Sequence, residues 1–164
     1  MSGQLDVARY KSFIAEALNV STKDIQALIL GGHGKSMVPM PRYTTIGGIP
    51  IRNLLSEDKV REAIHRTQLG GEEIINYLGR SGWYAAGAAV CEMVEAVICN
   101  HRRVFTACAY MNGEYGCIDI YLGVPVILGK NGVERIIELE LDPEDKERFE
   151  VSYQEVRTTL ALLQ

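Results

Sequence analysis

The chain changes character near Arg102, and this change limits the folds that it can adopt. Apolar residues recur at helical spacing before that point, whereas short apolar runs broken by turn residues dominate after it. Asn131-Gly132, in the last of these breaks, is a strong hairpin signal. Helices segregated from largely antiparallel strands predict an α+β fold and not a doubly wound parallel sheet. The predicted helices span 5–18, 56–78, 83–100 and 142–163, and the later predicted strands span 104–111, 117–122, 124–128 and 133–141.

Residues that cap helices predict where two of these helices begin. Ser56 can cap the second helix, and Gly70-Gly71 lie inside that helix or at a kink. Asp142 as the cap and Pro143 at the first position predict the start of the last helix. The apolar stripe of this helix is expected to consist of Phe149, Val156, Leu160 and Leu163. The alanine-rich helix at 83–100 is expected to be buried on most faces.

A histidine between glycines follows the short apolar run at 25–30, which predicts a buried strand. Glycine on either side of His33 lets the backbone and a ligand approach the imidazole closely. Gly34-Lys35-Ser36 looks like the end of a phosphate loop, but residue 29 is isoleucine where that motif has glycine. Pro39 and Pro41 argue against a helix there, and residues 43–51 are predicted to be extended. His33 at the mouth of a cleft is therefore the stronger candidate.

Length and composition predict one globular domain and exclude several classes of function. The chain has 164 residues, 47% of them hydrophobic, and a net charge of −4. No basic cluster is larger than Arg102-Arg103, which argues against nucleic-acid binding. Neither a signal peptide nor an apolar run of membrane-spanning length is visible, so we expect a cytoplasmic protein without a membrane partner. The four cysteines lack metal-ligand spacing, which predicts buried free thiols and no metal; a disulfide or zinc site is the alternative.

Asp6 and Arg9 add chemistry to the candidate site. They are three residues apart in a predicted helix and therefore share one face. A carboxylate such as Asp6 can fix the tautomer of an imidazole and stabilise its charged form. An arginine one turn away can hold a substrate carboxylate with two hydrogen bonds. An exposed ion pair without function is the alternative interpretation of these two residues.

Several ordered motifs resemble the catalytic half of the NAD-dependent malate and lactate dehydrogenases. The first is Leu5-Asp6-Val7-Ala8-Arg9, followed 27 residues after Asp6 by His33 in Gly-His-Gly. The resemblance covers essentially the whole chain and is closest to malate dehydrogenases of the lactate-dehydrogenase-like type. The further matching segments are Met37-Val38-Pro39, Ile46-Gly-Gly-Ile49-Pro50, Ser81-Gly82-Trp83-Tyr84-Ala85, Tyr115-Gly116 and Asp119-Ile-Tyr-Leu-Gly-Val-Pro-Val126.

The resemblance implies a role for each candidate residue. His33 exchanges a proton with the substrate oxygen while hydride moves between carbon 2 and the nicotinamide, and Asp6 orients His33. Arg9 binds the carboxylate beside the reacting carbon. Gly82 shapes the substrate pocket. Met37 lies near the nicotinamide, with a core methionine as the alternative interpretation.

The resemblance also implies a domain organisation. Residues 1–164 would form the catalytic, substrate-binding domain. The N-terminal Rossmann domain that binds most of the NAD is absent from this chain, which has no G-x-G-x-x-G motif. The helix that begins almost at the chain start hints that an upstream part has been removed. The expected partners are malate and oxaloacetate, the N-terminal domain and further copies of the chain in a homodimer or homotetramer, and the chain alone is expected to be inactive.

Two residues beside His33 bear on the substrate and on the alternatives. Gly32 stands where lactate enzymes of the family usually have glutamate, which favours malate. Lys35 stands where the family usually has aspartate, and we expect its charge to lower the pKa of His33. A lactate dehydrogenase, a non-catalytic oligomerisation module with a decayed site, and a glycoside hydrolase of shared ancestry remain alternatives.

Overall fold

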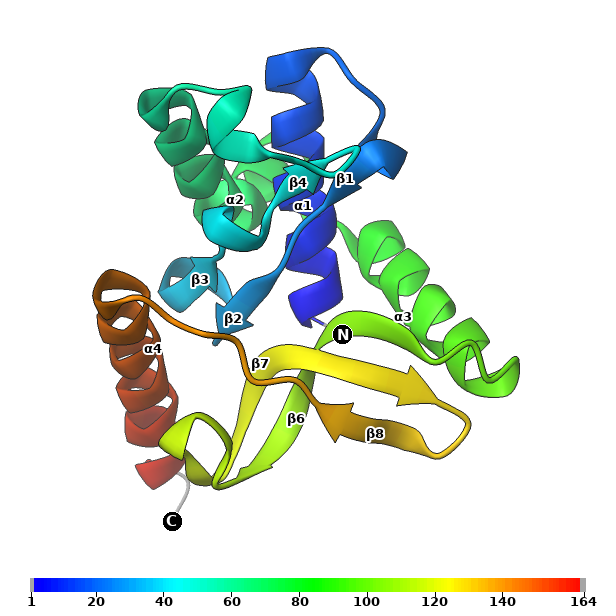
Figure 1. Cartoon of the computed structure of the whole chain (residues 1–164), viewed down its shortest axis with the longest axis vertical. Coiled ribbons are helices and arrows are strands. Elements are labelled where there is room, and N and C mark those ends of the chain that lie inside the picture. Colours follow the sequence, from blue (N-terminus) through cyan, green and yellow to red (C-terminus); the bar gives the residue numbers. More distant parts are fainter. Residues whose placement is uncertain (1, 163–164) are drawn as a thin grey trace.

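The computed structural model describes residues 2–162 and has an α+β fold in which every strand pairing is antiparallel, as predicted (Figure 1). Five strands form the main sheet, and three very short strands form a second one. The elements are α1 (Ser2–Leu18), β1 (Ile25–Gln26), β2 (Ile29–Gly31), β3 (Met37–Pro39), β4 (Thr45–Ile46), β5 (Ile49–Pro50), α2 (Glu57–Leu78), α3 (Trp83–Ile98), β6 (Arg103–Asn112), β7 (Ile118–Gly129), β8 (Gly132–Ile136) and α4 (Pro143–Ala161).

Strand β7 organises the main sheet. One of its edges pairs with β6 from Arg103↔Leu128 to Asn112↔Ile118, and β7 also pairs with β8 and, at one point, with β2. The predicted break at Gly123 is wrong, because β7 runs through it without interruption. Gly123 faces Gly31 of β2, where an added Cβ would lie only 2.6 Å from the Gly31 carbonyl oxygen. This glycine therefore permits a close approach of two strands and does not end one.

The hairpin at Asn131-Gly132 is confirmed, but the strand after it is shorter than predicted. Residues Gly129 and Gly132 pair across the turn, and β8 ends at Ile136. Beyond that point, the Tyr115 side chain contacts the backbone. Its hydroxyl donates to the Ile137 carbonyl at 2.8 Å and accepts from the Leu139 amide at 2.9 Å. The Tyr115 side chain thus serves the Ile137 carbonyl and the Leu139 amide, whereas the Ile137 amide still donates to the Pro125 carbonyl of β7.

The predicted capping hydrogen bond is present at the start of α4 but not, within residues 2–162, at the start of α2. The Asp142 carboxylate accepts from the Asp145 amide at 2.9 Å, and Pro143 opens α4 as predicted. Ser56 occupies the cap position of α2, but its side chain makes no capping hydrogen bond to the described residues. Helix α2 is continuous through Gly70-Gly71.

The apolar stripe predicted for α4 is buried only in part. Phe149 is buried, Val156 is half-buried and Leu160 is exposed, whereas Leu163 lies outside the described residues.

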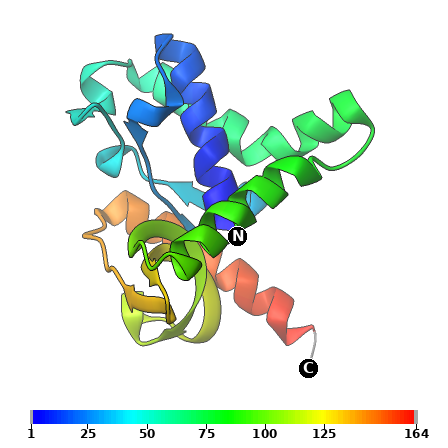
Figure 2. The ribbon, with the colours of Figure 1, turned by 90° about the vertical axis from the view of Figure 1, so that its right-hand side faces the viewer.

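Helix α3 is exposed, contrary to the prediction of burial on most faces. Only Ala89 and Ala96 are buried, while the aromatic side chains of Trp83 and Tyr84 are 61% and 85% exposed. The reason is visible in Figure 2, where α2 and α3 extend together away from the sheet and only part of α3 lies against other elements. The prediction of buried thiols is also wrong for Cys91, Cys99 and Cys108, since only Cys117 is buried.

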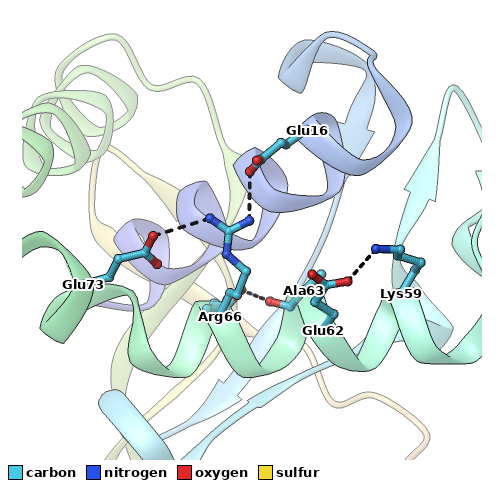
Figure 3. Close-up of polar contacts among 7 residues, drawn as sticks. Glu16, Lys59, Glu62, Ala63, Arg66 and Glu73 are labelled. Atoms are coloured by element: carbon cyan, nitrogen blue, oxygen red, sulfur yellow. Dashed lines mark hydrogen bonds and ion pairs between the residues drawn. The ribbon is translucent and has the colours of Figure 1, made fainter.

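Helices α1 and α2 are fastened together beside the sheet. Arg66 of α2 contacts Glu16 of α1 at 3.0 Å and Glu73 at 3.5 Å, as Figure 3 shows. Its guanidinium also lies 4.2 Å from the centre of the Phe13 ring of α1. A core cluster between these helices and β2–β3 includes Tyr10, which is fully buried. This packing fixes α1, the helix that carries two of the candidate residues.

No helix within residues 2–162 has both the length and the apolar character that a membrane crossing requires.

Candidate active site

Asp6 and His33 meet where α1 passes the end of β2. Asp6 lies on the inward face of α1 between buried Leu5 and Val7 and is 1% exposed. Strand β2 ends at Gly31, whose φ of +85° turns the chain and suits glycine. His33 follows, and its Nδ1 lies 2.8 Å from Asp6 Oδ2. When Nδ1–H donates to this carboxylate, Nε2 is left as the free base nitrogen of the ring.

The carboxylate also sets the electrostatics of the ring. The hydrogen bond to Asp6 raises the pKa of His33 above its ordinary value of 6.5, and the negative charge of Asp6 adds to the rise. Partial burial of the ring and the nearby Arg9 charge act in the opposite direction and do not overcome it. The His33 side chain is 52% exposed, so the ring is accessible from solvent. A ring of this kind can accept and return a proton near neutral pH.

Arg9 lies one helical turn from Asp6 and has donors to spare. Its Nη1 contacts Asp6 Oδ1 at 3.4 Å, a long contact and the one ion pair of this guanidinium with the residues that the structure describes. Its Nε is buried and has no hydrogen-bond acceptor among residues 2–162. The Arg9 side chain crosses α2 at Gly70, where an added Cβ would lie 3.3 Å from Arg9 Cδ. A planar carboxylate is the ligand that such a fork accepts best.

The residues after His33 form a short 3₁₀ turn, Gly34–Ser36, followed directly by β3. The absence of an α-helix here agrees with the argument from sequence against a phosphate loop. Lys35 points to α2, where its Nζ lies 3.5 Å from Glu72 Oε1. The expectation that Lys35 lowers the pKa of His33 is wrong, because that pKa is raised by Asp6 and the lysine charge is paired elsewhere.

Comparison with known proteins adds independent information on this arrangement. Residues 3–163 match the family model for the lactate/malate dehydrogenase, alpha/beta C-terminal domain. The chain belongs to this family. It is 48% identical over 164 residues to the malate dehydrogenase of Salinibacter ruber and 50% identical over 163 residues to that of Bacillus cytotoxicus. It covers 100% and 99% of its own length in these matches but 52% of each relative, so it spans about half the length of the curated relatives that it matches.

Solved structures agree with the sequence matches. The chain superposes on the malate dehydrogenase of Salinibacter ruber with a TM-score of 0.98, covering 100% of this chain and 54% of that one. It superposes on the lactate dehydrogenase of Eimeria maxima, solved with NADH and oxamate, with a TM-score of 0.95 at 37% identity. That match covers 99% of this chain and 51% of the lactate dehydrogenase. The α+β fold predicted from the segregated helices and largely antiparallel strands is thus the fold of lactate/malate dehydrogenase C-terminal domains.

Two predicted site residues of this lactate/malate dehydrogenase domain make no hydrogen bond or ion pair with Asp6 or His33 within the described part of the chain. Met37 is 2% exposed and packs in the core cluster between α1 and α2. Gly82 precedes α3, and the side chain nearest to it across the chain is Ile74 of α2. The geometry brings together Asp6, Arg9 and His33 and leaves the roles of Met37 and Gly82 as predictions.

Two polar side chains near His33 were missed from the sequence. Ser152 of α4 accepts a hydrogen bond from the Gly32 amide, and Gln68 of α2 donates to the carbonyls of Lys35 and Met37. Neither residue belongs to a motif, and both are far from His33 in the sequence. The signal that was available is the Gly31-Gly32 pair, because consecutive glycines indicate a close approach by another element.

Proposed function

We propose that this chain is the substrate-binding and catalytic half of an NAD-dependent malate dehydrogenase, which interconverts (S)-malate and oxaloacetate. The observation that carries the proposal is the 2.8 Å contact between His33 and a buried Asp6, with the unpaired donors of Arg9 one turn away. This arrangement supports one group that moves a proton and another that binds a carboxylate. The family membership and the two malate dehydrogenases of 48% and 50% identity support the same substrate class.

The proposed steps follow from the chemistry of these side chains. Arg9 binds the carboxylate next to carbon 2 and orients that carbon. His33 Nε2 removes the hydroxyl proton of malate as the carbon gives up hydride, and Asp6 stabilises the resulting imidazolium. In the reverse direction His33 returns the proton to the carbonyl oxygen of oxaloacetate. NAD, when bound, supplies the hydride acceptor of this reaction.

The residues present fit only part of such an enzyme. His33 is accessible and Arg9 has free donors, but the chain carries no glycine-rich dinucleotide motif. We therefore place most of the NAD contacts in an N-terminal Rossmann domain outside residues 1–164, and we expect the isolated chain to be inactive. A cytoplasmic homodimer or homotetramer is the form that we propose for the complete enzyme.

The test joins this chain to the NAD-binding half of the Salinibacter ruber relative, because the two chains superpose with a TM-score of 0.98. The fused enzyme is expected to oxidise NADH with oxaloacetate and to show much lower kcat/KM with pyruvate. The reverse preference would favour lactate dehydrogenase, the activity named for the Eimeria maxima structure.

Matched histidine variants distinguish the catalytic proposal from a non-catalytic module. His33→Ala is expected to abolish turnover, whereas His101→Ala, at an exposed position between α3 and β6, should retain it. A fused protein that folds, binds NADH and reduces neither oxaloacetate nor pyruvate would contradict the proposed activity.

A further inference from the structure

The main chain just before His33 is held by α4. The Gly32 amide donates to Ser152 Oγ at 2.8 Å, and the Ser152 side chain is completely buried. An internal hydroxyl that accepts from a single backbone amide fixes the position of that peptide group.

The packing around this hydrogen bond leaves little room for the peptide to move. A Cβ added to Gly32 would lie 2.9 Å from Ser36 Oγ and 3.2 Å from Val156 Cγ2 of α4. A Cβ added to Gly31 would collide with the Ser152 side chain itself. Helix α4 therefore contacts the backbone of β2 directly at Gly31, the last residue of that strand, and only glycine allows this contact.

The main chain just after His33 is held by α2. Gln68 Nε2 lies 3.2 Å from the Lys35 carbonyl oxygen and 3.2 Å from the Met37 carbonyl oxygen. One amide group thus contacts the middle residue of the 3₁₀ turn Gly34–Ser36 and the residue that follows the turn, and it ties both to the same helix. The contacts of Ser152 and Gln68 lie on opposite sides of His33 in the sequence.

The His33 ring depends on this backbone for its position. The His33 side chain is half exposed, and its hydrogen-bond partner among the described residues is Asp6. We propose that Ser152 and Gln68 are positioning residues that hold the main chain before and after His33, at Gly32 and at Lys35 and Met37, and thereby fix its ring against Asp6. Neither residue would touch the substrate. The proposal deepens the role of His33 in the proposed function, but its test needs no enzymatic activity.

The test measures the pKa of His33 by NMR in the 164-residue chain. The chain has three histidines, so the His33→Ala variant assigns the signal. The charged groups that act on the ring, Asp6 and Arg9, stay unchanged in every test variant. Because the hydrogen bond to Asp6 is the main reason why the pKa of His33 is raised, a displacement that takes the ring away from Asp6 is expected to lower the measured pKa.

Ser152→Ala and Gln68→Met each remove one of the contacts. Each is expected to lower the pKa of His33 by about 0.5 or more toward its ordinary value. Thr158→Ala is the matched control, because it removes an exposed hydroxyl of α4 that bonds within the helix. The control is expected to leave the pKa of His33 unchanged.

An unchanged pKa of His33 in folded Ser152→Ala and Gln68→Met would overturn the proposal. Should Ser152→Ala fail to fold, Gln68→Met decides alone, since Gln68 is only half-buried. The proposed function can fail separately: a lowered pKa in both variants together with an inactive fused enzyme would keep the positioning role and refute the dehydrogenase.

Discussion

Replacing Asp6 with asparagine removes the negative charge beside His33 while keeping the shape of the side chain. Asp6 is buried and accepts from both His33 and Arg9, whereas one amide oxygen would have to serve both donors. A hydrogen bond to a charged group contributes about 1.5–3 kcal/mol. Because the His33 ring is half exposed, solvent screening reduces this contribution, and we expect its coupling to Asp6 to be roughly 1–2 kcal/mol when the ring is charged.

The coupling should depend on pH with a definite sign. The folded-state pKa of His33 is raised above 6.5, so the stabilisation is complete below about that pH. It is lost as the pH rises through the raised pKa of the folded chain. A double-mutant cycle of Asp6→Asn and His33→Ala, measured by urea unfolding, should therefore give a larger coupling at about pH 6 than at about pH 9. A coupling that is zero at both pH values, or that grows with pH, would refute this reasoning.

Three further perturbations follow from the same contacts. Arg66→Met should lower the free energy of unfolding by roughly 1–2 kcal/mol in a urea titration, because it removes the Glu16 ion pair and the charge over the Phe13 ring. An unchanged midpoint of urea unfolding would mean that these contacts between α1 and α2 do not stabilise the fold. Gly31→Ala should lower the free energy of unfolding by roughly 3 kcal/mol or more, because of the positive φ and the collision with α4. Gly34 also has a positive φ but has open space around it, so Gly34→Ala should lower the free energy of unfolding by about 1–2 kcal/mol in the same assay. Equal losses would argue against the close packing. In the fused enzyme, Arg9→Lys should raise KM for oxaloacetate roughly tenfold or more, since lysine lacks the planar fork, and an unchanged KM would remove Arg9 from the binding site.

The helix start and the hairpin that depend on a few adjacent residues could be predicted from the sequence. Asp142 and Pro143 predicted the start of α4, and Asn131-Gly132 predicted the hairpin between β7 and β8, because caps and turns depend on a few adjacent residues. The predicted strand break at Gly123 is wrong because it rests on local pattern alone. The function of this glycine is a close contact with Gly31, some ninety residues away, and no local pattern reveals which element approaches a glycine.

Burial was harder to predict than secondary structure. The alanine-rich composition of α3 suggested a core helix, yet most of its side chains are exposed because α2 and α3 extend away from the sheet. Composition gives the apolar character of a helix, but the tertiary arrangement decides what covers it. The three exposed cysteines were misjudged for the same reason.

The candidate site was predictable only in part. The spacing of Asp6 and Arg9 placed them on one helical face, but nothing local to residues 6 and 33 brings the carboxylate and the ring together. That step came from the ordered motifs of the family resemblance, and the structure places the two groups 2.8 Å apart. Ser152 and Gln68 left no motif, because a single hydrogen bond to a backbone group needs only one side chain at the right place in space.

The pH dependence of kcat/KM in both directions of the fused enzyme tests the central claim most directly, because it reports the ionisation of the free catalytic group. With His33 as the acid/base, malate oxidation should rise with pH to a plateau above a pKa higher than 6.5, and oxaloacetate reduction should fall above that same pKa. Asp6→Asn should move both inflections to lower pH. Profiles that lack opposite slopes, or inflections that Asp6→Asn leaves in place, would contradict the assignment of His33 and Asp6 to proton transfer.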